Sequence, residues 1–100
     1  MDDRTATREE VRRLALEAVA AMPDDRRTEL LGLAAGMRPL GETARRKRLG
    51  ELVADTTRRA EGIGADGASA LAIGMAEAMV VSRELEWLDL VAAPRPADRA

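Results

Sequence analysis

Aromatic residues are almost absent from this 100-residue chain, and that absence constrains its fold more than any other feature. Trp87 is the single aromatic side chain, and Phe and Tyr do not occur. Large rings usually supply much of the area that a core buries, so Leu, Val, Met and Ala must supply it here. A domain of this size buries only roughly 60–70% of its unfolded surface. We therefore expect a modest core and a chain that gains stability by oligomerisation, with itself or with another protein.

Apolar residues recur at the helical period in four segments, and no run of β-branched or aromatic residues alternates with polar ones as in a strand. Thr7 and Glu10 have the spacing of a capping box at the start of the first segment. Pro23 favours a first-turn position in a new helix. Pro39 ends that second helix, because the residue before a proline avoids helical geometry. We predict helices at about residues 7–22, 23–37, 40–61 and 68–92.

The first half of the fourth predicted helix is apolar almost all round, which is typical of a buried helix. Ala70, Gly74 and Ala78 recur every four residues on it, and such small residues let the backbone of another helix come close. The fold class that we predict is all-α, a small four-helix bundle that is mainly antiparallel, with the fourth helix most buried. We expect residues 1–93 to form a single domain and residues 94–100 to form a flexible C-terminal tail.

Charged residues make up 34% of the chain but leave a formal net charge of only −2. This balance does not indicate a nucleic-acid or membrane-surface protein as a whole. Residues 38–59 hold seven basic and three acidic side chains, whereas residues 60–93 hold one basic and six acidic side chains. We expect these two segments either to attract each other within the fold or to present a basic face and an acidic face to partners.

Histidine and cysteine are both absent. Their absence removes the commonest general base, the commonest metal ligand and the thiolate nucleophile. The remaining polar side chains form no convincing catalytic pair, so we expect no enzyme activity, no metal site and no cofactor. The charged N-terminus lacks the apolar stretch of a signal peptide, and the longest apolar run, residues 68–81, is too short to span a bilayer. We therefore expect a cytoplasmic protein without membrane contact.

The fourth predicted helix also carries the candidate partner interface. Trp is enriched at energetically important interface positions, and Met side chains adapt to different partners. The predicted helices have more apolar surface than three short helices can easily cover, so we expect a protein partner or a second copy to cover part of it. The candidate interface residues are Met75, Met79, Leu85, Trp87, Leu88 and Val91, with an ordinary core as the alternative interpretation.

Four consecutive basic residues lie near the start of the third predicted helix: Arg45, Arg46, Lys47 and Arg48. Such a cluster can bind a phosphate backbone, where basic side chains displace counterions. Alternatively, it is a solvated turn whose cations pair with acidic residues at neighbouring helical positions, namely Glu42, Glu51 and Asp55.

The run from Met22 to Arg27, followed by Leu30 and Leu31, loosely resembles the DNA-reading end of sigma factors and related regulators. The resemblance covers about thirty residues and implies a helix-turn-helix, with its turn at residues 36–38 and its recognition helix at residues 40–52.

The function that we predict is that of a non-enzymatic protein–protein interaction module, such as an adaptor, regulatory or assembly subunit, that works by helix packing. The apolar face of the fourth helix would make the contact, and the basic start of the third helix would set its orientation or add a second contact. The alternative hypothesis is a small nucleic-acid-binding regulator that uses the basic helix in a helix-turn-helix-like arrangement.

Overall fold

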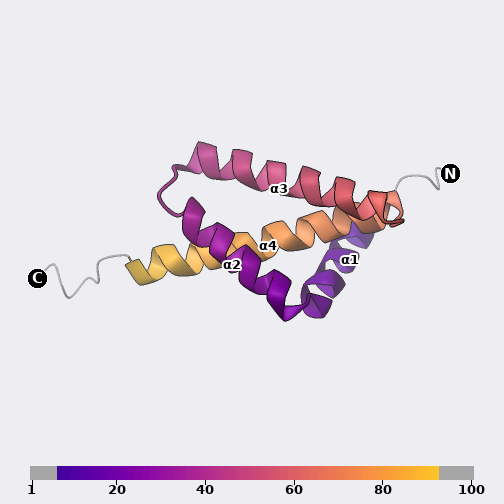
Figure 1. The fold of residues 1–100 in the computed structure, drawn as a ribbon, viewed down its shortest axis with the longest axis horizontal. Helices are drawn as coiled ribbons and strands as arrows, with labels where there is room; N and C mark the ends of the chain where they lie inside the picture. Colours follow the sequence, from indigo (N-terminus) through magenta and orange to yellow (C-terminus); the bar gives the residue numbers. More distant parts are fainter. Residues whose placement is uncertain (1–6, 93–100) are drawn as a thin grey trace, which may run out of the picture.

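The computed structural model describes residues 7–92, which form four α-helices joined by short connections (Figure 1). The helices are α1 (Arg8–Ala21), α2 (Asp24–Met37), α3 (Glu42–Gly62) and α4 (Gly67–Ala92). No strand occurs among the described residues, so the all-α prediction is confirmed. The tail predicted at residues 94–100 lies outside the described part of the chain.

The predicted helix boundaries are confirmed to within about two residues, the usual scatter of such assignments. The Thr7 side chain accepts a hydrogen bond from the backbone N–H of Glu10 (3.0 Å) and so caps α1. Pro23 occupies the N-cap position of α2. At the start of α4, the carboxylate of Asp66 accepts a hydrogen bond from the N–H of Ser69 (2.9 Å). Thr7 and Asp66 each satisfy a backbone donor that would otherwise lack a partner, whereas Pro23 forms no side-chain cap hydrogen bond.

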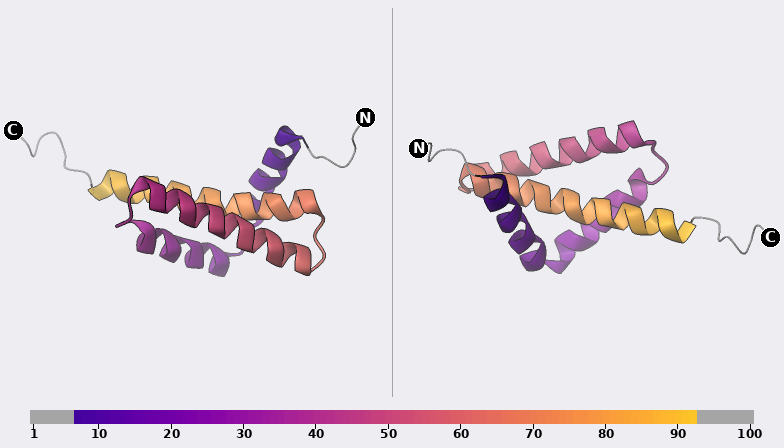
Figure 2. Two further views of the ribbon diagram at one scale, coloured as in Figure 1. Left: turned by 90° about the horizontal axis from the view of Figure 1, so that it is seen from above. Right: turned by 180° about the vertical axis from the view of Figure 1, so that it is seen from behind.

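α4 is the central helix of the bundle, and each of the other three helices packs against it (Figure 1). α3 lies antiparallel beside α4, while α1 and α2 form a V whose two arms both rest on α4 (Figures 1 and 2). At the corner of the V, the Arg27 guanidinium donates a hydrogen bond to the carbonyl oxygen of Val19 (2.7 Å), one of the last carbonyls of α1. The prediction that the fourth helix is the most buried is therefore confirmed.

The core of the bundle is small and aliphatic. Leu30 and Val81 are its largest fully buried side chains. Around them, α2 and α4 form one cluster that contains no aromatic ring, and its buried members are Leu30, Ala34, Met37, Val80, Val81 and Leu85. Because alanine buries little area per residue, this core agrees with the modest one that the composition predicts.

The seam of small residues on α4 brings two helices unusually close. A Cβ atom built on Gly74 would lie 2.7 Å from Thr57 Oγ1 and 2.8 Å from the carbonyl oxygen of Val53, both on α3. Ala70, one turn earlier, is fully buried, and Ala78, one turn later, is half-buried. The predicted close approach of another helix backbone is confirmed at Gly74, and α3 is that helix.

Candidate functional site

The most unusual surface of the bundle is a side of α4 that carries no charge. Between Asp66 and Arg83 the chain has one charged residue, Glu77, and Glu77 is buried. Leu71 and Met75, in contrast, are 39% and 42% exposed. Ala68, Ala78 and Ser82 are half-buried and lie on the same side of α4 as Leu71 and Met75. We call these five residues the uncharged face.

The neighbouring helices leave part of α4 open. In the right-hand view of Figure 2, α2 lies behind α4, α3 lies to one side of it, and α1 crosses in front of its N-terminal half. The end of α1 also lies beside the middle of α4, where Leu16 and Val19 line one cavity together with Met79. Gly74 marks the line along which α3 contacts α4. With 3.6 residues per turn, Leu71 and Met75 lie roughly 60° and 100° round the helix from Gly74. The uncharged face therefore lies beside the α3 contact and remains accessible to a partner.

The candidate interface residues predicted from the sequence do not form one surface. Met75 lies on the uncharged face, and Met79 is half-buried next to it, where it lines a cavity of about 300 Å³ between α1, α2 and α4. Leu85 is only 5% exposed and belongs to the core cluster. Its side chain packs inside the bundle, so it cannot contact a partner without local rearrangement.

The remaining candidates lie further along α4. Leu88 is half-buried, while Trp87 and Val91 are 58% and 62% exposed. Trp87 and Val91 point about 120° and 160° away from Met75 around the helix. They form a separate apolar patch together with Leu90, which the sequence analysis did not single out and which is 69% exposed.

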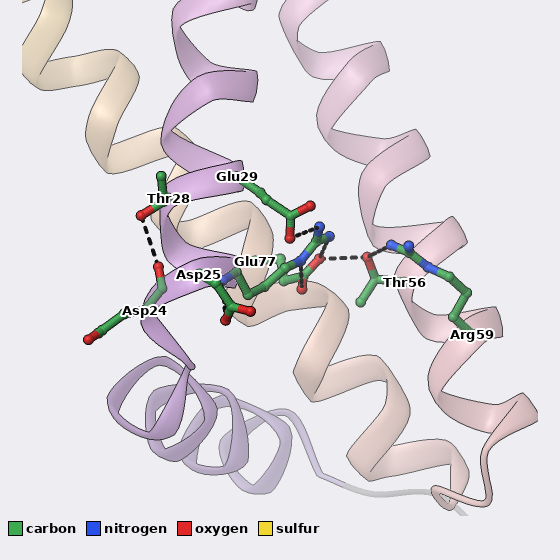
Figure 3. A network of polar contacts seen from close by, with 8 residues as sticks. Asp24, Asp25, Thr28, Glu29, Thr56, Arg59 and Glu77 are labelled. Carbon is green, nitrogen blue, oxygen red and sulfur yellow. Dashed lines mark hydrogen bonds and ion pairs between the residues drawn. The ribbon is translucent and has the colours of Figure 1, made fainter.

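A buried ion pair joins three helices beside the core (Figure 3). Arg26 of α2 binds Glu77 of α4 through two hydrogen bonds, from Nε to Oε2 (2.7 Å) and from Nη2 to Oε1 (2.6 Å). The Thr56 hydroxyl of α3 donates to the same Oε1 (2.7 Å), and Arg59 donates to the Thr56 hydroxyl oxygen (3.2 Å). This network fixes α2 and α3 at one level along α4.

The network keeps the buried carboxylate ionised. Burial by itself raises the pKa of Glu77, but the hydrogen bonds from Arg26 and Thr56 and the positive charges of Arg26 and Arg59 outweigh it, so the pKa lies below its usual value. The hydrogen bond to Glu77 raises the pKa of Arg26. Both oxygens of Glu77 accept hydrogen bonds from side chains of neighbouring helices. An ionised carboxylate held in this way is suited to positioning helices rather than to exchanging protons.

This network was not predicted from the sequence, although the sequence carries one signal for it. Glu77 is the only charged residue in a stretch of α4 that is otherwise apolar, and a carboxylate in a buried helix requires a cationic partner. The identity of that partner depends on how α2 and α3 are rotated about their own axes. The sequence therefore indicates that Glu77 is paired but does not identify Arg26.

The four consecutive basic residues have separate roles in the structure. Arg45 is half-buried and donates hydrogen bonds to Asp89 of α4 (2.7 and 3.2 Å) and to the carbonyl oxygen of Arg38 (2.6 Å). The Arg45–Asp89 hydrogen bond raises the pKa of Arg45 and lowers that of Asp89. This contact joins the basic and the acidic segment of the chain within the fold, which is one of the two arrangements expected from their charges.

The other three basic residues point to solvent. Arg46 pairs with Glu42, one turn earlier on α3 (2.8 Å), whereas Lys47 and Arg48 form no ion pair within residues 7–92. The pair between Arg46 and Glu42 is one of those expected for a solvated turn. The nucleic-acid hypothesis therefore depends mainly on Lys47 and Arg48.

The predicted helix-turn-helix would consist of α2 and α3, which a short connection at residues 38–41 joins. Here both helices pack chiefly on α4, and the space between them is an open groove lined by side chains from both, among them Leu33 and Leu52.

Within residues 7–92, no group of three or more His, Cys, Asp or Glu side chains is arranged to hold a metal ion. None of the four helices is long and apolar enough to cross a membrane. Comparisons of the chain with protein-family models, with curated proteins and with solved structures gave no match.

Proposed function

We propose that this chain is a non-enzymatic protein–protein interaction module, an adaptor, regulatory or assembly subunit of the cytoplasm, that binds a helix of its partner through the uncharged face of α4. One observation carries the proposal. In a chain with 34% charged residues, the side of α4 around Leu71 and Met75 is exposed and carries no charge on that helix.

The physical reason is the low cost of removing such a face from water. Burying a charge without a partner is very unfavourable, and charged residues are accordingly depleted in the centres of interfaces, where Met is enriched. On this face only apolar groups and the hydroxyl of Ser82 would lose their contact with water. Each Å² of apolar surface that the partner covers contributes roughly 25 cal/mol.

Small residues on the face give the partner helix a further advantage. Ala68, Ala78 and Ser82 have short side chains, so the partner backbone can come close to α4 and gain dispersion contacts along its length. Leu71 and Met75 would then insert between side chains of the partner. Helix packing of this kind requires no catalytic group.

The test is capture of partners from an extract of the native host, with tagged protein and matched variants. Met75→Asp places a charge in the centre of the uncharged face and should abolish capture of the physiological partner, while far-ultraviolet circular dichroism remains that of the wild type. Ile63→Asp is the matched control, because Ile63 is an apolar residue that is 89% exposed and lies in the loop that connects α3 to α4. Equal capture by all three proteins would contradict the proposal.

One half of each sample is treated with nuclease. Capture that survives the nuclease and depends on Met75 supports the interaction module. Capture that is lost with the nuclease, falls steeply with salt and is removed by Lys47→Gln with Arg48→Gln would instead favour the alternative, a nucleic-acid-binding regulator.

A further inference from the structure

We propose that the partner of the uncharged face is a second copy of this chain, and that the two α4 helices pair in antiparallel orientation. This inference rests on the proposed function and names the partner for the same surface.

The spacing of the face fits helix pairing. The five residues of the uncharged face follow one another at intervals of alternately three and four positions. This is the spacing of the contact positions in paired helices. The five residues span about 21 Å of helix at a rise of 1.5 Å per residue. A second helix can therefore follow the face from end to end.

The order of side-chain sizes along the face selects the partner. From position 71 to position 82 the large residues, Leu71 and Met75, come first and the small residues, Ala78 and Ser82, follow, while Ala68 adds one small residue at the N-terminal end. A second copy that runs in the opposite direction presents small residues where the first presents large ones. The face is therefore complementary to itself, as a two-fold symmetric interface requires.

The pairing can be stated residue by residue. A two-fold axis between positions 76 and 77 sets Leu71 opposite Ser82 of the second copy and Met75 opposite Ala78 of the second copy. These layers each combine one large and one small side chain, which fills space evenly. Ala68 lies beyond them, because the position opposite it is 85 and Leu85 belongs to the core cluster. Parallel pairing would stack large on large and small on small, and would leave a gap beside Ala78 and Ser82.

Electrostatics does not oppose this pairing. A face rich in one sign of charge repels its own copy, but here neither α4 helix brings a charge into the contact. Glu77 of each chain points inward to Arg26 and away from the second copy. The core cluster of each chain is small and contains no aromatic residue. The apolar area that a dimer would bury between the two α4 helices would therefore add to the stability of each fold.

The size of the face sets the expected affinity. The paired part of the face, from Leu71 to Ser82, is about 16 Å long and about 10 Å wide, the diameter of a helix, which is smaller than the roughly 800 Å² that each partner buries in a standard interface. We therefore expect a reversible dimer that forms at micromolar or higher concentration.

The first measurement is the mass of the purified protein in solution, by sedimentation over a dilution series. The wild-type mass should rise from that of the 10.8 kDa monomer to twice that value as the concentration increases. Met75→Asp should remain a monomer, and the control Ile63→Asp should behave as the wild type. A wild-type protein that stays at 10.8 kDa up to millimolar concentration would overturn the inference.

That failure can be distinguished from failure of the proposed function. If the wild type is a monomer but Met75→Asp still loses partner capture, the face is an interface for another protein. If the wild type dimerises through Met75 but capture from the extract is unaffected, the self-association stands and the adaptor role is contradicted.

The second measurement tests the orientation. The chain has no cysteine, so single cysteines at positions 71 and 82 report on their own neighbours. Antiparallel pairing predicts that Leu71→Cys mixed with Ser82→Cys oxidises to a mixed disulfide dimer, while Leu71→Cys alone does not. In that arrangement two cysteines at position 71 are separated by about 16 Å along the axis, beyond the roughly 7 Å limit between bridged Cα atoms. Rapid cross-linking of Leu71→Cys alone would show parallel pairing and refute the antiparallel model.

Discussion

Replacing Gly74 with alanine tests the close approach between α3 and α4. In an open helix interior this change stabilises a protein by about 0.5–1 kcal/mol, since glycine loses more backbone entropy on folding than alanine. At Gly74 the new Cβ would meet Thr57 Oγ1 at 2.7 Å and the carbonyl oxygen of Val53 at 2.8 Å. The Thr57 hydroxyl can rotate, but the carbonyl belongs to the α3 backbone and can move only with the helix.

The expected magnitude follows from these two opposing effects. Overfilling a packed site costs about 1–3 kcal/mol, and we place Gly74 in the upper half of that range because a backbone atom is involved. After the gain in helix propensity is subtracted, Gly74→Ala should destabilise the fold by about 1–2.5 kcal/mol. That is a measurable part of the roughly 5–15 kcal/mol by which small domains are stable.

Gly50→Ala is the matched control. Gly50 also lies within a helix, but no atom outside its local backbone lies within 4 Å of the position where its Cβ would be. It should stabilise the fold by about 0.5–1 kcal/mol. Urea unfolding followed by circular dichroism, at one fixed protein concentration, measures both variants. Equal midpoints for Gly74→Ala and Gly50→Ala would refute the close approach.

Three further predictions follow from the core and its ion pairs. Glu77→Gln should lower the free energy of unfolding at neutral pH by about 3 kcal/mol, the lower end for breaking a buried pair. Because folding lowers the pKa of Glu77, the wild type should lose stability as pH falls below the normal carboxylate range of about 4, and the variant should lose less in acid titrations of unfolding. Leu85→Ala should destabilise by about 2–5 kcal/mol, whereas Trp87→Ala should change stability by less than about 0.5 kcal/mol; similar urea midpoints would contradict their assigned positions. Arg45→Gln should lower the thermal midpoint more than Arg46→Gln, because only Arg45 bridges two helices, and an equal effect in differential scanning would contradict that role.

The helices of this chain could be predicted because their signals are local. Pro23 and Pro39 separate α1, α2 and α3, and glycines mark the turn before α4. Capping by Thr7 depends on residues only three positions apart, so the sequence alone indicates it. The central position of α4 followed from its apolar circumference, since a helix that is apolar all round must be covered on most sides.

The candidate interface was harder to predict because it depends on which side of α4 faces the core. Leu85 and Trp87 are two residues apart and so point in nearly opposite directions, yet both are apolar. Only the packing of α2 against α4 shows that Leu85 points inward and Trp87 outward. The lack of charge around Met75 was visible in the sequence, but its meaning depends on Glu77 pointing toward Arg26.

The most direct test of the interaction surface is site-specific photo-cross-linking in living cells of the native host. A photo-reactive residue placed at position 75 should, on irradiation, join the chain covalently to another polypeptide, and at twice the monomer mass if that polypeptide is a second copy. The same residue at position 63, in an exposed loop, should give no such product. If position 75 yields no protein adduct, or no more than position 63, the uncharged face of α4 is not an interface.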